Sequence, residues 1–181
     1  GLLEDNQDNF KVRVNVESGF LNPLEFIANN WSDININASL EAYLSGYNDP
    51  RIGKYIDKAT NAKTTGYKGI RAGAEGLVKE TYATYSKINI KDGNNPSFNT
   101  ATAPLLMTAA EVYFLRAEAA LRGWANAGGS VQSLYEQGIT TSFAQWSATG
   151  ASTYIQNSSL TPAAYTDPLN SNNNAAKPSD T

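Results

Sequence analysis

The sequence of 181 residues contains no cysteine and no histidine. Without these side chains the chain cannot form a disulfide, a thiol nucleophile or the common zinc and haem sites, and it lacks the most usual general base. Most common types of enzyme active site are therefore excluded. We therefore expect no enzymatic activity, no cofactor and no catalytic residue.

The sequence also has little net charge and no long apolar run. Its 14 Lys and Arg residues stand against 17 Asp and Glu, which leaves no basic surface for a nucleic acid. No apolar stretch reaches the roughly 18 residues of a membrane span, and residues 1–10 lack the basic and apolar regions of a signal peptide. At 41% hydrophobic residues, the chain can still build a folded core.

Strong helix formers are concentrated in PLLMTAAEVYFLRAEAALRGW, from Pro104 to Trp124. Pro104 suits the first turn of a helix and Gly123 suits its end, so the run predicts one helix packed on several sides. Glu118 and Arg122, four residues apart, can pair along it.

A second helix is predicted from Val131 to Trp146, where apolar residues recur at spacings of three and four. Ser130 can cap its start, and Tyr135 and Trp146 are expected in the core. The two helices predict an antiparallel hairpin over 104–147. Because this hairpin is so apolar, we expect part of it to be exposed in the isolated chain.

The rest of the sequence has weaker patterns. Val12, Val14 and Val16 alternate with polar residues and predict a half-buried strand over 10–18. Residues 60–103 show no sustained period and are expected to be largely irregular. Short helices are predicted after three capping residues, Asn22, Asn37 and Asp49.

Several segments together resemble the SusD/RagB family. The run LMTAAEVYFLRAEAALRGW, followed by YEQGITTSFAQW, resembles the family's signature helical hairpin. Upstream, LEAYLSGYNDPRIGKY at 40–55 and YKGIRAG at 67–73 resemble its DPR-type and YxGI-type segments, in the expected order. The resemblance covers roughly residues 30–150. Family members are usually much longer, so we expect this chain to be an internal portion of such a protein.

The resemblance implies a fold and a function. The fold would be mainly α and SusD-like, with a tetratricopeptide-like hairpin at 104–147, long irregular loops and little strand. Residues 1–165 would belong to one domain, and 166–181 would be a polar loop or a disordered tail. The family binds glycans or other nutrients at the outer surface of the outer membrane and passes them to a SusC-type TonB-dependent transporter. Its lipid anchor would lie outside this chain.

Candidate ligand-binding residues are predicted from loop position and chemistry alone. Sugars place their C–H faces on aromatic rings, while polar side chains bind their hydroxyls. Asn30 and Asp33 are possible hydroxyl partners. The predicted binding residues are Trp31, Tyr47, Tyr67, Arg71 and Tyr82. For any one aromatic residue, partial burial in the fold is the more common role.

Other interpretations stay open at this point. A helical hairpin can serve as a scaffold that binds a protein and no small ligand. Glu111 and Glu118 share a helix face and could in principle flank a glycosidic bond, although ion pairing is the more common role of such carboxylates. Acidic clusters at 4–8 and 92–95 could hold calcium but lack the ligand spacing of an EF-hand, so we expect solvated turns and no metal.

Overall fold

The computed structural model describes residues 2–31, 34–60, 63–90 and 97–179. It divides into two compact units. The first unit comprises Gly1–Val14 and Ala103–Ser158, and the second comprises Asn15–Thr102 and Ser159–Thr181. The described residues are mainly helical with little strand, which confirms the predicted fold class. Whether residues 1–165 act as a single domain stays a prediction.

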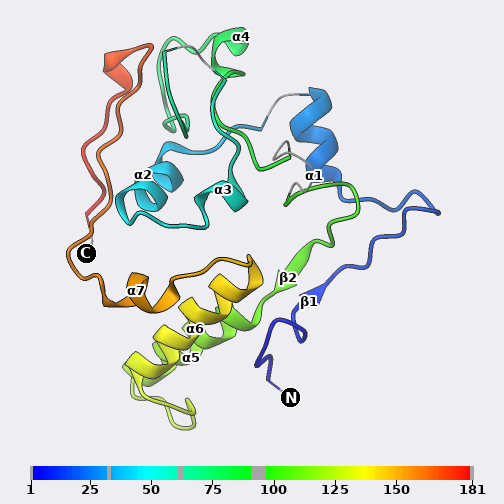
Figure 1. Ribbon diagram of the computed structural model, residues 1–181, viewed down its shortest axis with the longest axis vertical. Coiled ribbons are helices and arrows are strands. Elements are labelled where there is room, and N and C mark those ends of the chain that lie inside the picture. Colours follow the sequence, from blue (N-terminus) through cyan, green and yellow to red (C-terminus); the bar gives the residue numbers. More distant parts are fainter. Residues whose placement is uncertain (1, 32–33, 61–62, 91–96, 180–181) are drawn as a thin grey trace. The chain divides into compact units, whose positions relative to one another are not determined.

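A helical hairpin forms most of the first unit. Helices α5 (Ala109–Leu121) and α6 (Val131–Gln145) lie side by side, as predicted (Figure 1). Small buried residues on α5, among them Ala110 and Ala117, allow the close approach. Gly138 on α6 has the same role, because a Cβ there would lie 2.7 Å from the Phe114 ring.

The predicted start of the first hairpin helix is wrong. Residues Leu105–Met107 form strand β2, which pairs antiparallel with β1 (Phe10–Lys11). The helix begins only after Thr108, whose hydroxyl accepts a hydrogen bond from the Glu111 N–H at 3.1 Å. Pairing with a strand that is distant in the sequence overrides the local helix preference of this run.

The predicted strand over 10–18 is also too long. Only Phe10–Lys11 is strand, because the chain turns back shortly afterwards. Asn15 pairs with Phe20 across a turn in which Gly19 has a φ of +75°. A left-handed backbone of this kind favours glycine and ends the extended segment.

The outer surface of the hairpin is apolar and exposed, as the sequence predicts. Leu115 is 49% exposed and Leu121 is 73% exposed. Tyr135 is 56% exposed, so its predicted place in the core is wrong, although its ring contacts Phe114. The interpretation of α5 as a helix packed on several sides is therefore also wrong for this surface.

The second unit consists of short helices and loops. Asn22 caps α1 (Pro23–Phe26), which continues into a π-helix over Ile27–Trp31, and Asn37 caps α2 (Ala38–Gly46). Both caps agree with the sequence. Asp49 accepts from the Arg51 N–H before α3 (Ile52–Tyr55), which is shorter than predicted. A fourth helix, α4 (Lys79–Tyr82), falls in a segment expected to be irregular.

The core of the second unit combines an apolar cluster with buried polar groups. Ile36, Leu44 and Ile56 form the apolar cluster. The buried Glu41 carboxylate accepts from the Lys68 ammonium at 2.5 Å and from the Gly69 N–H at 2.7 Å. Pairing with both donors offsets the cost of burying this charge.

The segment after residue 165 contributes to the same core. It contains a 3-10 helix over Ser171–Asn173, and Tyr165 pairs with Ala175. Asp167 and Asn173 are buried. No helix among the described residues is long and apolar enough to span a membrane.

Candidate functional site

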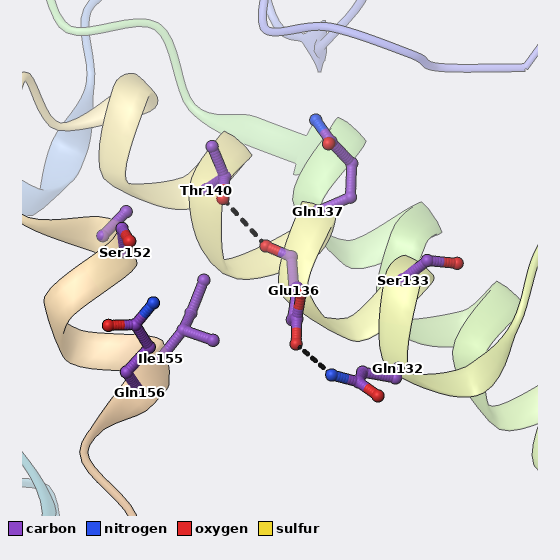
Figure 2. Close-up of a pocket in the computed structure, with 9 residues that line it drawn as sticks. Gln132, Ser133, Glu136, Gln137, Thr140, Ser152, Ile155 and Gln156 are labelled. Atoms are coloured by element: carbon purple, nitrogen blue, oxygen red, sulfur yellow. Dashed lines mark hydrogen bonds between the residues drawn. The ribbon is translucent and has the colours of Figure 1, made fainter.

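A groove of about 580 Å³ lies between α6 and α7 (Ala151–Gln156), both in the first unit (Figure 2). Helix α7 follows Gly150, whose φ of +86° permits the sharp entry into the helix. The Phe143 and Tyr154 rings, with centroids 5.2 Å apart, hold α7 against α6. The volume falls within the roughly 300–1,000 Å³ of small-molecule sites.

Most of the residues that line the groove are polar, and the lining is almost uncharged. It consists of Gln132, Ser133, Glu136, Gln137, Thr140, Ala151, Ser152, Ile155 and Gln156. Three amides and three hydroxyls can each donate and accept hydrogen bonds. Such groups suit a ligand that carries many hydroxyl or amide groups of its own.

The α6 wall of the groove is ordered by hydrogen bonds along the helix. Gln132, Glu136 and Thr140 are spaced by four residues and therefore share one face. The Gln132 amide donates to a Glu136 carboxylate oxygen at 2.7 Å, and the Thr140 hydroxyl donates to the Glu136 carbonyl at 2.9 Å. Figure 2 shows Ser152, Ile155 and Gln156 on the opposite wall.

The charge of the groove restricts what it can bind. Glu136 is the one ionisable residue among those that line it, and no Lys or Arg belongs to this lining. An anionic ligand would meet a like charge with no compensating cation. The groove therefore favours neutral polar ligands over anionic ones.

The five predicted binding residues all lie in the second unit and none lines the groove. Trp31 is 56% exposed and packs edge-to-face on Phe26, with ring centroids 5.6 Å apart. Arg71 is exposed, whereas Tyr67 is partly buried against the apolar cluster. Tyr47 is partly buried at the end of α2.

Tyr82 does not occupy the exposed loop that was expected. It ends α4, is only 5% exposed, and donates its hydroxyl to Asp167 at 3.0 Å. A ring this deeply buried is not accessible for stacking on a sugar. Of the two residues proposed as partners for sugar hydroxyls, Asn30 is exposed and Asp33 lies outside the described residues.

Sequence reasoning missed the groove and also missed Tyr43. The ring of Tyr43 is parallel to that of Tyr47, with centroids 6.3 Å apart. Their spacing of four residues is one helical turn, but the sequence predicts a turn at 45–49, so the pair was not expected. The groove had no comparable indication, because it arises where two helices separated by a turn come together.

The alternative sites have ordinary structural roles. Glu118 pairs with Arg122 at 2.6 Å, as predicted. The cluster at 4–8 is a turn in which Asp8 accepts from the N–H groups of Glu4 and Asp5. These backbone hydrogen bonds lower the pKa of Asp8. Within the described residues, no three His, Cys, Asp or Glu side chains meet as a possible metal site, and the cluster at 92–95 lies outside them.

Comparison with known families gives one match over the entire chain. Residues 1–181 match the SusD-like family described as SusD and RagB outer membrane lipoproteins. No curated protein matches the chain.

Solved structures of SusD homologues are similar to the whole chain. A chitin-binding SusD homologue from Flavobacterium johnsoniae is 40% identical, with a TM-score of 0.86 over 98% of this chain and 34% of its own. A SusD homologue from Bacteroides thetaiotaomicron is 36% identical, with a TM-score of 0.85 over 99% of this chain and 35% of its own. One from Bacteroides vulgatus is also 36% identical, with a TM-score of 0.78 over 99% of this chain and 33% of its own. The chain thus spans about a third of the length of these relatives.

Proposed function

The chain belongs to the SusD and RagB family of outer membrane lipoproteins, and from this membership we propose that it is part of a protein that binds neutral glycans. Binding takes place without chemical conversion of the ligand. The observation that carries the proposal is the 40% identity to a chitin-binding homologue over nearly the whole chain. Chitin is an uncharged glycan. The α6–α7 groove suits an uncharged ligand, because its lining contains no Lys or Arg to bind an anionic one.

The groove supports this proposal through its chemistry. Hydroxyl and acetamido groups of a sugar exchange hydrogen bonds with water for hydrogen bonds with Gln132, Thr140 and Gln156. Each such exchange contributes about 1 kcal/mol. Several of them together give a site of modest affinity, which suits capture followed by release.

The setting of this activity is part of the proposal. The protein acts at the outer membrane, on the extracellular face, and is attached by a lipid anchor that lies outside this chain. It hands its ligand, a glycan or a related nutrient, to a SusC-type TonB-dependent transporter. The family description supports the outer membrane location.

Titration calorimetry of the 181-residue chain with a panel of oligosaccharides tests the proposal. The panel contains chito-oligosaccharides, malto-oligosaccharides and acidic oligogalacturonates. A double variant, Gln132→Ala with Gln156→Ala, is expected to weaken binding of a neutral oligosaccharide about thirtyfold, because it removes two hydrogen-bonding groups of about 1 kcal/mol each. Gln7→Ala, at an exposed glutamine outside the groove, is the matched control. Equal affinities of the double variant and the control would exclude the groove as the site.

A second candidate function is a scaffold that binds a protein partner through the hairpin. The exposed side chains of Leu115, Leu121 and Tyr135 favour it. This reading predicts that no oligosaccharide in the panel binds. It also predicts that Leu115→Ser with Leu121→Ser removes a protein interaction and leaves the fold intact.

A further inference from the structure

Two tyrosine rings lie parallel on the surface of α2 in the second unit. Tyr43 and Tyr47 are one helical turn apart, with ring centroids 6.3 Å apart and an angle of 2° between the ring planes. Tyr43 is 41% exposed and Tyr47 is partly buried. The two ring planes are parallel, and Tyr43 is exposed enough for its ring to contact a flat, weakly polar ligand.

The opposite side of α2 is firmly fixed, which holds the two rings in place. The buried Glu41 carboxylate is bound by Lys68 and by the Gly69 N–H. The Ala42 carbonyl accepts from the Ala163 N–H at 2.9 Å. These contacts tie the helix to two other segments of the unit.

Gly46 adds a third constraint near the end of the same helix. A Cβ at this position would lie 2.3 Å from the Thr161 carbonyl oxygen and 2.4 Å from the Ala163 nitrogen. The helix therefore touches the backbone of 161–163 directly. A surface held this closely loses little conformational freedom when a ligand binds, which favours binding.

Polar groups flank the two rings. Asn48 follows Tyr47 in a left-handed conformation with a φ of +50°, and its side chain is exposed. Ser39 lies one turn before Tyr43 and is also exposed. An amide at one end and a hydroxyl at the other can accept and donate to sugar hydroxyls, while the rings contact the C–H face between them.

We propose that Tyr43 and Tyr47 form a stacking platform for pyranose rings of the glycan. The proposal rests on the proposed function, since it assigns a subsite for the same class of ligand. The platform is separate from the α6–α7 groove, and neither requires the other.

The test is calorimetry of the full chain with a neutral oligosaccharide that the wild type binds. Tyr43→Ala is expected to weaken binding about fivefold to tenfold, because aromatic contacts of this kind contribute about 1 kcal/mol. Tyr43→Phe keeps the ring and is expected to bind like the wild type. Leu40→Ala, at another exposed apolar residue of α2, is the matched control and is expected to have no effect.

Three results would overturn the platform. Unchanged binding by Tyr43→Ala, with the wild type binding the glycan, would reject the platform and leave the proposed function standing. Equal losses in Tyr43→Ala and Leu40→Ala would show that the effect is not specific to the aromatic ring and would reject the platform. A wild type that binds no oligosaccharide of the panel would reject the proposed function, and the platform with it. Circular dichroism spectra of each variant check that α2 remains folded.

Discussion

The Tyr85 hydroxyl donates a hydrogen bond to the Asp167 carboxylate at 2.5 Å, although 82 residues separate them in the sequence. Both residues are buried. The same carboxylate accepts from the Tyr82 hydroxyl and from the Asn173 amide, each at 3.0 Å. Every buried side-chain nitrogen and oxygen in the described residues has a partner, and here the partners join residues 165–175 to the segment around α4.

This network changes the acidity of its members. Burial raises the pKa of Tyr85, and the hydrogen bond to the neighbouring Asp167 carboxylate raises it further. Burial also tends to raise the pKa of Asp167, but the hydrogen bonds from Tyr85, Leu169, Asn173 and Tyr82 outweigh it and lower the pKa overall. The folded state therefore favours a charged Asp167 beside neutral tyrosines.

Removal of the Asp167 carboxylate should destabilise the second unit. In Asp167→Ala the hydroxyls of Tyr82 and Tyr85 lose their acceptor while they remain buried, at a cost of roughly 3 kcal/mol. Urea denaturation, followed by circular dichroism, measures the change in the free energy of unfolding. Glu17→Ala removes the same charge from an exposed site and should change it by less than about 0.5 kcal/mol. Equal stabilities of the two variants would contradict the role of the network.

The stability of this unit should fall in acid because of Asp167. The pKa of this carboxyl is lower in the folded state than its ordinary value of about 3.9. The stabilisation is therefore fully present above about pH 4 and is lost as the pH falls through the lowered pKa. Thermal unfolding between pH 2 and pH 7 measures this loss. Asp167→Asn should flatten the decline, and a decline as steep as that of the wild type would show that other carboxylates cause it.

Gly46→Ala should destabilise the protein although alanine is the better helix former. The gain in helix propensity is about 1 kcal/mol. The added Cβ would lie 2.3 Å from the Thr161 carbonyl, and a backbone contact cannot move aside as a side chain can. We expect a net loss of about 2 kcal/mol in urea denaturation. Ser45→Ala, at the adjacent exposed position, should be neutral or slightly stabilising, and a similar loss there would contradict the close contact.

Thr108 should contribute to the stability of the hairpin as the cap of α5. Its hydroxyl accepts from the Glu111 N–H, so Thr108→Ala is expected to lower the free energy of unfolding by about 1 kcal/mol. Thr153→Ala, at an exposed position within α7, should instead raise it by a few tenths of a kcal/mol. Denaturation curves of the two variants should move in opposite directions. A shift in the same direction would favour a helix that begins upstream, near Pro104.

The sequence predicted those parts of the fold that local chemistry determines. Asn37 and Ser130 cap helices where expected, and Gly123 ends the first hairpin helix with a φ of +71°. These features depend on residues within one turn of each other. The same holds for the pair of Glu118 and Arg122, which lie four residues apart on one helix.

Features that depend on distant segments could not be predicted in the same way. Strand β2 exists because Leu105 and Met107 find a partner near residue 10. Tyr82 is buried because Asp167 and Asn173 approach it from the end of the chain. The α6–α7 groove depends on the angle at which Gly150 redirects the chain. Periodicity and propensity contain no information on such contacts.

The most direct test of the account is calorimetry of the chain with neutral and acidic oligosaccharides of equal length, combined with analysis of the recovered sugars. We expect saturable binding of a neutral oligosaccharide, recovery of that sugar unchanged, and affinity for oligogalacturonate at least tenfold lower, since Glu136 is the one charge in the groove lining. Hydrolysis of the sugar would contradict the binding role. Equal or tighter binding of the acidic oligosaccharide would contradict the assignment of the groove as the site.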